Sequence, residues 1–408
     1  MSNARVLIIT NGPLARNPRV YKEAATLGAV GHDVTVLVPR NHAPSEPFDA
    51  KLCAGAPFHR VPLDLLPGFD TPNWQVFLRL LRHRLSRQAM TRFRWPSLHA
   101  LGPAAFLLRA ARRHPADLTI VHNEVPHAVG LRLLAEGRRV AADIEDWHSE
   151  DLLASSRRHR PIALLQANER ALLHHAAYTT TTSESLADAL HARYGGCRPT
   201  VITNSFPLGP LSTSPAARPP RLLWFSQTIG PGRGLEALVT AWAATRAPSE
   251  LTLLGEDLCG FGAALRQQLP ASHHASLYLE PLVAPEVLPL VIAQYDIGLA
   301  LEHPEPASRD LTITNKILQY LNAGLAVIAT PTAGQREVLA HAPAAGILID
   351  LAAPPTVTAA LLDSLFADLA LPARRAAARQ LAANRYCWER ESPRLVALVA
   401  EALARPAA

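Results

Sequence analysis

Three clusters of polar residues in this 408-residue chain have the types and spacing to bind a phosphate group or a hydroxyl-rich ligand. The first cluster contains Gly12, Asn17 and Arg19, which follow the apolar segment 5–10. A loop between a strand and a helix can present backbone N–H groups to a phosphate or a sugar at the start of that helix. The alternative interpretation is an ordinary turn with exposed arginines.

The second cluster follows two further apolar segments. His122 comes directly after residues 118–121, and Glu145 and Asp146 come directly after residues 140–144. In open α/β sheets, ligands bind at the carboxyl ends of parallel strands. A single histidine is more often structural, but this position predicts that His122 and the two acids face a ligand.

The third cluster places two cations at the starts of predicted helices. Arg233 lies in the glycine-rich turn 230–234, and an arginine can bind a phosphate through two parallel hydrogen bonds. Leu235 replaces the third glycine of a dinucleotide-binding fingerprint, which disfavours a nicotinamide site. The alternative for Arg233 is a surface arginine in a flexible turn.

Lys316 is the second of these cations. It stands in the first turn of a predicted helix that is capped by Thr314 or Asn315 and ends at Gly324. A lysine there opposes the helix dipole, so its position favours an anion bound near the helix start. The alternative is a solvated lysine that costs only a few tenths of a kcal/mol.

The segments that carry these clusters alternate between strand and helix patterns. Short apolar runs are followed by residues at helical spacing, which predicts parallel sheets built from βαβ units. Residues 206–220 are rich in proline, serine and glycine, as in a linker. The sequence therefore predicts an α/β fold of two doubly wound, Rossmann-like domains, 1–205 and 221–384, which face a ligand-binding cleft. The predicted strands cover residues 5–10, 34–38, 117–121, 140–144, 178–182, 221–226, 251–254, 276–279, 296–301, 326–330 and 346–349.

The composition restricts the class of protein and its surroundings. Hydrophobic residues make up 49% and charged residues 18%, so the chain can build large cores and is not disordered. The net charge of +6 suits a protein that handles anions and is too small to indicate nucleic acid. Four widely spaced cysteines, no signal-peptide pattern and no membrane-length apolar run predict a cytoplasmic protein. The lack of a metal-binding spacing such as HExxH predicts a site without metal.

A basic amphipathic segment covers residues 74–90. Its tryptophan, phenylalanine and leucines recur at the spacing of one helical face, and six arginines but no acid fall within residues 79–94. Most such segments are solvated helix faces. The alternatives are a peripheral contact with the anionic inner face of a membrane and binding of an anionic acceptor, which could be a glycan, a lipid-linked molecule or a small molecule.

Taken in order, these features resemble a retaining glycosyltransferase of the GT-B fold, in the large family 4 that uses nucleotide-sugar donors. The resemblance extends over nearly the whole chain. In chain order, the matching parts are the first βαβ unit (17–36), the strand-end histidine (121–124), the acidic strand end (143–146), the turn before the linker (202–205), the phosphate-binding loop (225–235) and the tryptophan-containing C-terminal helix (384–391).

The resemblance implies transfer of a glycosyl unit from a UDP- or GDP-sugar to an unidentified acceptor, with retention at the anomeric carbon. The nucleotide sugar is then a substrate, and no cofactor is expected. Arg233 and Lys316 would stabilise the diphosphate leaving group, and His122 would orient the sugar. The helix at about 385–408 would return to the first domain. The remaining implied residues are Gly12, Thr314, Asn315 and Gln319 for the donor, and Asn17, Arg19, Glu145 and Asp146 for the sugar and acceptor side.

The sequence departs from the family pattern at three positions. Gln227 stands where the family's phosphate loop has a cation, and the family's paired glutamates fall on Leu311 and Gln319. Gln319 can still accept a hydrogen bond from a ribose hydroxyl, without charge assistance. Two other interpretations therefore stay open: a nucleotide-sugar epimerase of the same fold, and a non-catalytic partner that binds a nucleotide or a glycan.

Overall fold

The computed structural model describes residues 3–95, 97–157, 159–211, 219–367 and 369–405. The chain divides into two compact units. Unit 1 comprises Met1–Ile202, Pro306–Ser308 and Ser392–Ala408, and unit 2 comprises Thr203–Glu305 and Arg309–Glu391. The segment predicted as a linker, 206–220, belongs to unit 2, and its residues 212–218 lie outside the described residues. The cleft predicted for the ligand stays a prediction.

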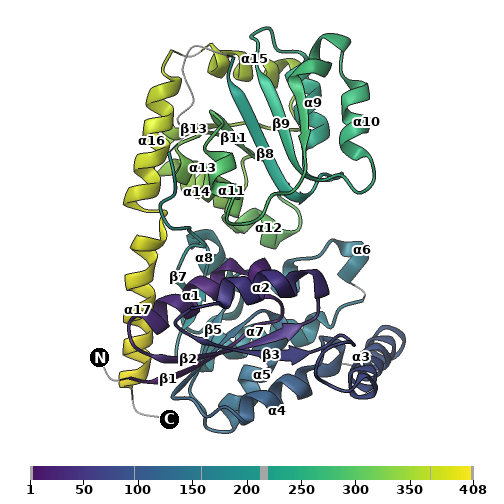
Figure 1. Ribbon diagram of the computed structural model, residues 1–408, viewed down its shortest axis with the longest axis vertical. Coiled ribbons are helices and arrows are strands. Elements are labelled where there is room, and N and C mark those ends of the chain that lie inside the picture. Colours follow the sequence, from purple (N-terminus) through teal and green to yellow (C-terminus); the bar gives the residue numbers. More distant parts are fainter. Residues whose placement is uncertain (1–2, 96, 158, 212–218, 368, 406–408) are drawn as a thin grey trace. The chain divides into compact units, whose positions relative to one another are not determined.

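Unit 1 is built on a parallel sheet of seven strands in the order β3-β2-β1-β4-β5-β6-β7 (Figure 1). Its strands are β1 (Arg5–Ile9), β2 (Asp33–Arg40), β3 (His59–Asp64), β4 (Leu118–His122), β5 (Val140–Asp143), β6 (Thr179–Thr181) and β7 (Thr200–Val201). Its helices are α1 (Pro18–Ala29), α2 (Glu46–Cys53), α3 (Asn73–Phe93), α4 (Ala104–Arg112), α5 (Glu124–Ala135), α6 (Ala154–Arg157), α7 (Ile162–His175) and α8 (Glu184–Tyr194).

Helices cover both faces of this sheet because its strands are apolar on both sides. On β1, Leu7 and Ile9 belong to one buried cluster with residues of α4, α5 and α7. Val6 and Ile8, which alternate with them, pack with residues of α1 and of the C-terminal helix α17 (Trp388–Ala404). The last turns of α17 therefore form part of the core of unit 1, and its first four residues belong to unit 2.

Unit 2 repeats the arrangement with six parallel strands in the order β10-β9-β8-β11-β12-β13. Its strands are β8 (Arg221–Thr228), β9 (Glu250–Glu256), β10 (Leu277–Glu280), β11 (Ile297–Ala300), β12 (Ala326–Ala329) and β13 (Gly346–Leu348). Its helices are α9 (Leu235–Ala243), α10 (Phe261–Gln268), α11 (Leu288–Ile292), α12 (Ala307–Leu311), α13 (Asn315–Ala323), α14 (Ala333–Ala340), α15 (Pro355–Phe366) and α16 (Leu371–Asn384). One face packs on α9 and α15 and the other on α13 and α16.

The predicted strands and the doubly wound α/β class are confirmed, and two strands were missed. β3 contains Pro62 and charged residues, and the proline fits because β3 lies at the edge of the sheet. β7 is only two residues long and lies at the opposite edge. Within the described ranges, no single helix is both long and apolar enough to cross a membrane.

Candidate functional site

A polar pocket of about 480 Å³ lies in unit 1 where β1, β4 and β5 end. Three of the residues predicted from the sequence, Gly12, Asn17 and Asp146, line it. Asn123 and His148, which follow the same two strand ends as His122 and Asp146, line it as well. The carboxyl ends of neighbouring parallel strands bring these residues together, which is the position expected for a ligand in a doubly wound sheet.

The loop after β1 enters α1 through a short 3₁₀ turn, Leu14–Arg16. Asn17 is the N-cap of α1, and its side-chain oxygen accepts a hydrogen bond from the backbone N–H of Val20 at 3.3 Å. The N–H groups of Leu14 and Ala15 donate to the Asp49 carboxylate, at 3.1 and 2.7 Å. These two backbone donors, which the sequence suggested for an anion, are therefore occupied by a carboxylate of the chain itself.

Asp146 presents a carboxyl group to the pocket that has no hydrogen-bond or ion-pair partner within the described part of the chain. Burial raises its pKa to about 8, with further contributions from the nearby charges of Glu145, Asp151 and Asp143. At neutral pH most Asp146 side chains are therefore protonated, and a neutral carboxyl group can both donate and accept a hydrogen bond.

Glu145 is held beside the pocket by two amides. Its Oε1 accepts hydrogen bonds from Asn123 Nδ2 at 2.5 Å and from Asn17 Nδ2 at 3.5 Å. Burial, and then the charge of Asp143, raise the pKa of this carboxyl above its usual value. Glu145, in the loop after β5, therefore connects two residues that line the pocket, Asn17 after β1 and Asn123 after β4.

Asn123 has a backbone conformation that is unusual for a residue with a side chain. Its φ is +69° and its ψ 170°, at the turn between β4 and α5. Backbone conformations of this kind cost about 1–3 kcal/mol and cluster at functional sites. The strain turns the chain sharply after His122 and sets the Asn123 amide against Glu145.

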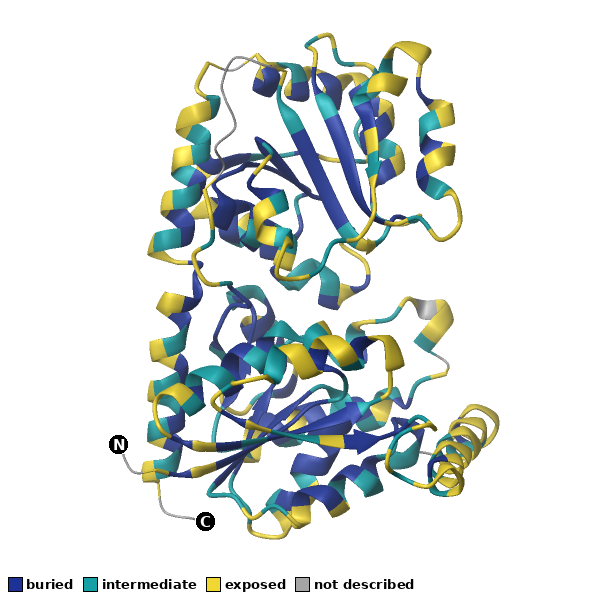
Figure 2. Ribbon diagram, in the orientation of Figure 1, coloured by how far each residue is buried: buried dark blue, intermediate teal, exposed yellow. Residues whose placement is uncertain are grey.

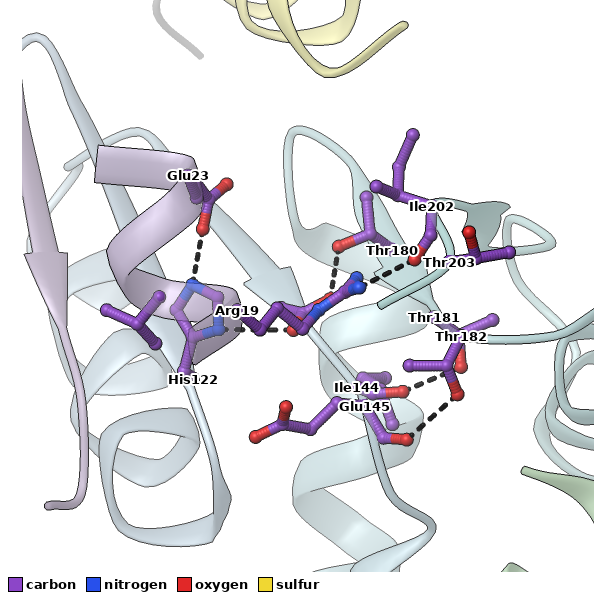
Figure 3. A network of polar contacts seen from close by, with 12 residues as sticks. Arg19, Glu23, His122, Ile144, Glu145, Thr180, Thr181, Thr182, Ile202 and Thr203 are labelled. Atoms are coloured by element: carbon purple, nitrogen blue, oxygen red, sulfur yellow. Dashed lines mark hydrogen bonds and ion pairs between the residues drawn. The ribbon is translucent and has the colours of Figure 1, made fainter. Parts of the chain in front are cut away.

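His122 lies beneath this pocket in a buried network of charged groups (Figure 3). It is 1% exposed, its Nε2 lies 2.5 Å from Glu23 Oε2, and its Nδ1 lies 3.1 Å from Asp143 Oδ2. Burial alone would lower the pKa of the imidazole, but the carboxylates of Glu23 and Asp143 raise it to about 10. The ring is therefore a buried cation whose two nitrogens face carboxylates.

Arg19 belongs to the same network rather than to the pocket. It is 3% exposed, and its Nε and Nη2 both donate to the Asp143 carboxylate at 2.6 Å. Its Nη1 donates to the carbonyl oxygen of Ile202 at 2.6 Å, and Thr180 Oγ1 donates to Asp143 Oδ1 at 2.6 Å. The structure thus differs from the expectation that Arg19 contacts an acceptor, because its guanidinium is engaged inside the protein. It positions Asp143, and through it His122.

Two neutral imidazoles lie close to this network. Burial lowers the pKa of His127 to about 4 and that of His148 to about 3. His127 Nε2 donates to the backbone carbonyl of Asp143 at 2.8 Å, and the two rings lie 5.4 Å apart. His148 Nε2 is buried without a hydrogen-bond partner in the described structure, and His148 lines the pocket. The pocket therefore presents the Asp146 carboxyl group to a ligand hydroxyl, whereas the unpartnered Nε2 of His148 is buried.

In unit 2, Arg233 stands in the turn that precedes α9. Gly232 and Gly234 have φ of +72° and +77°, conformations that a residue with a side chain rarely adopts. A Cβ on Gly234 would also lie 2.4 Å from Leu351 Cδ1. The half-buried Arg233 has no hydrogen-bond or ion-pair partner among the described residues, so its guanidinium is available to an anion.

Lys316 lies in the first turn of α13, as predicted, with Thr314 as the N-cap and Gly324 as the C-cap. Its Nζ donates to Glu302 Oε1 at 2.5 Å and lies 6.0 Å from the centre of the Trp224 ring. The negative charge that the sequence argument assigned to a ligand is thus supplied by Glu302, a buried residue just after β11. Sequence reasoning missed Glu302, although its place after a buried strand was a signal.

The other predicted donor residues lie around the start of α13. Asn315 is exposed, and its side-chain oxygen accepts a hydrogen bond from Asn204 Nδ2 at 2.9 Å. Thr314 Oγ1 is buried without a partner in the described structure, although a threonine N-cap usually bonds to its own helix. Gln319 follows Lys316 on α13 and is half-buried.

Within the described residues, no group of three or more histidine, cysteine, aspartate or glutamate side chains could hold a metal ion. The chain also presents no match to any curated protein in a sequence comparison. Residues 17–205 match the model of the glycosyl transferase 4-like domain.

Several solved structures share the fold over almost the whole chain. Sucrose-phosphate synthase from Thermosynechococcus elongatus superimposes with a TM-score of 0.70 at 15% identity, covering 98% of this chain and 99% of that chain. HepE of Anabaena, in complex with UDP and glucose, gives 0.67 at 17% identity, with 98% and 100% covered. A glycosyltransferase from Rickettsia africae gives 0.65 at 12% identity, with both chains fully covered.

The two doubly wound units and these similarities show the GT-B fold. The match over residues 17–205 is to a glycosyltransferase domain. The resemblance inferred from the sequence motifs is therefore confirmed. Over residues 17–205 the chain is similar to the glycosyl transferase 4-like domain.

Proposed function

We propose that the protein transfers a glycosyl unit from a UDP- or GDP-sugar to a hydroxyl-bearing acceptor, with retention at the anomeric carbon. The observation that carries the proposal is the polar pocket at the ends of β1, β4 and β5, where Asp146 offers an unpartnered carboxyl group to hydroxyls. Support for the donor class comes from HepE, whose structures contain UDP with glucose and UDP-glucose.

In this proposal the donor diphosphate binds to groups of unit 2. The Arg233 guanidinium, which has no partner among the described residues, is available for phosphate oxygens. Thr314 would act at the start of α13 as its N-cap. The ammonium of Lys316 adds a second positive charge, although it shares that charge with Glu302. As the bond from the anomeric carbon to the diphosphate breaks, negative charge grows on the leaving group, and cations fixed nearby stabilise it.

The sugar and its acceptor would use the groups of unit 1. Asp146, protonated at neutral pH, can donate to one hydroxyl and accept from another. A leaving-group phosphate oxygen would take the proton of the acceptor hydroxyl, so no separate protein base is needed. His122 would act by holding Asp143 and the β4–α5 turn in place, because both of its nitrogens already face carboxylates.

A thermal-shift experiment tests the donor part of the proposal. UDP or GDP at a hundredfold excess over its Kd should stabilise the protein by about 2.7 kcal/mol, in the presence of EDTA as well as in its absence. Arg233→Ala should weaken this effect about tenfold or more in Kd, because a charge-assisted hydrogen bond is worth about 1.5–3 kcal/mol. Arg246→Ala is the matched control, since Arg246 is an exposed arginine beyond the opposite end of α9.

The result contradicts the proposal if no nucleoside diphosphate shifts the melting temperature, or if EDTA abolishes the shift. Equal loss of binding in Arg233→Ala and Arg246→Ala would show that Arg233 does not bind the donor and that the loss reflects a non-specific effect of charge.

We also propose that α3 brings the protein to an anionic membrane surface. Most of the helix is exposed (Figure 2), and its exposed apolar residues include Trp74 at 64% and Phe77 at 63% exposure. A helix that combines exposed aromatic residues with arginines is typical of the interfacial region of anionic membranes. Sedimentation with anionic vesicles at low salt, lost at high salt, is the expected result, and equal indifference to anionic and neutral vesicles would refute it.

A further inference from the structure

A second pocket of unit 1, of about 300 Å³, lies between α3 and the start of α4 and has an unusual charge balance. Five basic side chains line it and none of its lining residues is acidic: Arg79, Arg82, His83, His99 and Arg109. We call it the basic pocket. It is separate from the polar pocket at the strand ends, with which it shares no lining residue.

The inner part of the basic pocket is fixed by contacts with neutral groups. The Arg79 guanidinium lies 3.7 Å from the centre of the Phe106 ring, and its Nη1 donates to the carbonyl oxygen of Asp64 at 2.8 Å. His83 Nδ1 donates to the carbonyl oxygen of His99 at 2.7 Å. These contacts orient the basic side chains. The charge of the Asp64 carboxylate also acts on Arg79, but Asp64 does not line the pocket.

The outer arginines of the pocket are left without partners. Neither Arg82 nor Arg109 has a hydrogen bond or an ion pair with any described residue. Arg112, one turn further along α4, shows the usual alternative, since it pairs with the Glu136 carboxylate at 2.5 Å. A bound anion would therefore supply the negative charge that Arg82 and Arg109 lack.

The bases of the pocket also act on one another. Burial, and then the like charge of Arg109, lower the pKa of Arg79. Burial, and then the charges of Arg82 and His83, lower the pKa of His99. A bound anion would relieve this repulsion, and arginine side chains are suited to phosphate because they can form two parallel hydrogen bonds with it.

The rim of the basic pocket indicates the source of the phosphate. Trp74 and Leu78 line the pocket and are 64% and 52% exposed. Further along α3, Phe77 and Leu85 are also more than half exposed. A phosphate site with an apolar rim matches a lipid, whose phosphate lies directly above its acyl chains.

We propose that the basic pocket between α3 and α4 binds a phosphate ester and that this ester is the headgroup of an anionic phospholipid. The inference deepens the membrane contact proposed above and rests on it only for the lipid source. It does not depend on glycosyl transfer. A phosphomonoester carries a charge of about −1.5 to −2 and three acceptor oxygens, which suits several basic side chains better than a single charge does.

Two binding experiments on the full chain test the proposal. The first measures sedimentation with phosphatidylcholine vesicles that contain either phosphatidic acid, with its accessible phosphomonoester, or phosphatidylserine at equal charge. The second measures calorimetric binding of glycerol 3-phosphate in solution. Arg82→Ala/Arg109→Ala removes the pocket cations, and Arg84→Ala/Arg87→Ala removes the same charge from exposed positions of α3 outside the pocket.

The wild type should prefer phosphatidic acid over phosphatidylserine and should bind glycerol 3-phosphate. Arg82→Ala/Arg109→Ala should lose both the preference and the solution binding, by roughly tenfold for each arginine. Arg84→Ala/Arg87→Ala should weaken binding to both vesicles equally and leave glycerol 3-phosphate binding unchanged. Phe77→Ser/Leu85→Ser should lose vesicle binding and keep solution binding.

The outcomes separate the two proposals. If Arg82→Ala/Arg109→Ala and Arg84→Ala/Arg87→Ala behave alike in both assays, the phosphate site is refuted, even if anionic vesicles still bind. If glycerol 3-phosphate binds through Arg82 and Arg109 while no vesicle does, the lipid source is refuted together with the membrane contact of α3.

Discussion

Replacement of Asp143 by asparagine should destabilise the protein far more than an ordinary loss of one surface charge. Its carboxylate accepts three hydrogen bonds, two from Arg19 and one from Thr180, each at 2.6 Å, and it lies 3.1 Å from His122 Nδ1. An asparagine offers one acceptor oxygen, and its NH₂ group would face the Arg19 guanidinium. Two buried cations would then lose their shared partner, leaving the Glu23 carboxylate beside His122 and the charge of Glu145 further away. Breaking a buried ion pair in this way costs about 3–5 kcal/mol.

The free energy of unfolding, from urea denaturation of the full chain, measures this cost. Asp117→Asn is the matched control, because Asp117 also pairs with one arginine, Arg5, at 2.9 Å, with both side chains about half exposed. A surface pair of this kind contributes about 0–1 kcal/mol. A double-mutant cycle with Arg19→Gln should give a coupling energy well above 1 kcal/mol. If Asp143→Asn costs no more than Asp117→Asn, the buried network does not hold unit 1 together as argued.

Three further predictions concern the site. Gln319→Glu should tighten UDP or GDP binding by a modest factor, because an ionised acceptor makes stronger hydrogen bonds to ribose hydroxyls. If the calorimetric affinity is unchanged in both Gln319→Glu and Gln319→Ala, residue 319 does not contact the ribose. Asp146→Asn should be more stable than the wild type above pH 4, and the gain in stability should grow up to about pH 8. The raised pKa of Asp146 makes the folded state retain a proton that the unfolded state loses near pH 3.8, so the wild type loses stability over this range. A gain that is independent of pH in thermal melts would contradict this. The pKa of His122 is raised to about 10, so the charged imidazole contributes stability that is fully present below pH 6.5, the usual pKa of histidine, and is lost as the pH rises toward 10. His122→Gln should therefore remove this loss from the pH profile of stability. A profile equal to that of the wild type would refute the buried cation.

The fold could be predicted from the sequence because its signals are local. Buried parallel strands appear as short apolar runs, and the helix around Lys316 is bounded by Thr314 and Gly324, which cap it in the structure. β3 was missed because its proline and charged residues resemble a loop, and only its edge position makes them acceptable.

The candidate site could be predicted in part, because strand ends gather at one edge of a parallel sheet. This rule predicted that Gly12, Asn17 and Asp146 lie close together, and all three line one pocket. Side-chain pairing between distant residues could not be predicted, since no local pattern reports that Arg19 meets Asp143 or that Glu302 meets Lys316. For the same reason, the sequence predicted that Arg19 and Lys316 contact a ligand, whereas each of them pairs with a carboxylate of the protein.

Analysis of the products formed from nucleotide sugars tests the central claim most directly. NMR spectroscopy of the chain incubated with a panel of UDP- and GDP-sugars, with water as the default acceptor, follows the donor, the released nucleotide and the anomeric configuration of the first-formed sugar. We predict release of a nucleoside diphosphate and a product with the same anomeric configuration as the donor. Isomerised donor without nucleotide release, inverted product, or tight donor binding with no turnover would each contradict the proposal that this chain is a retaining glycosyltransferase.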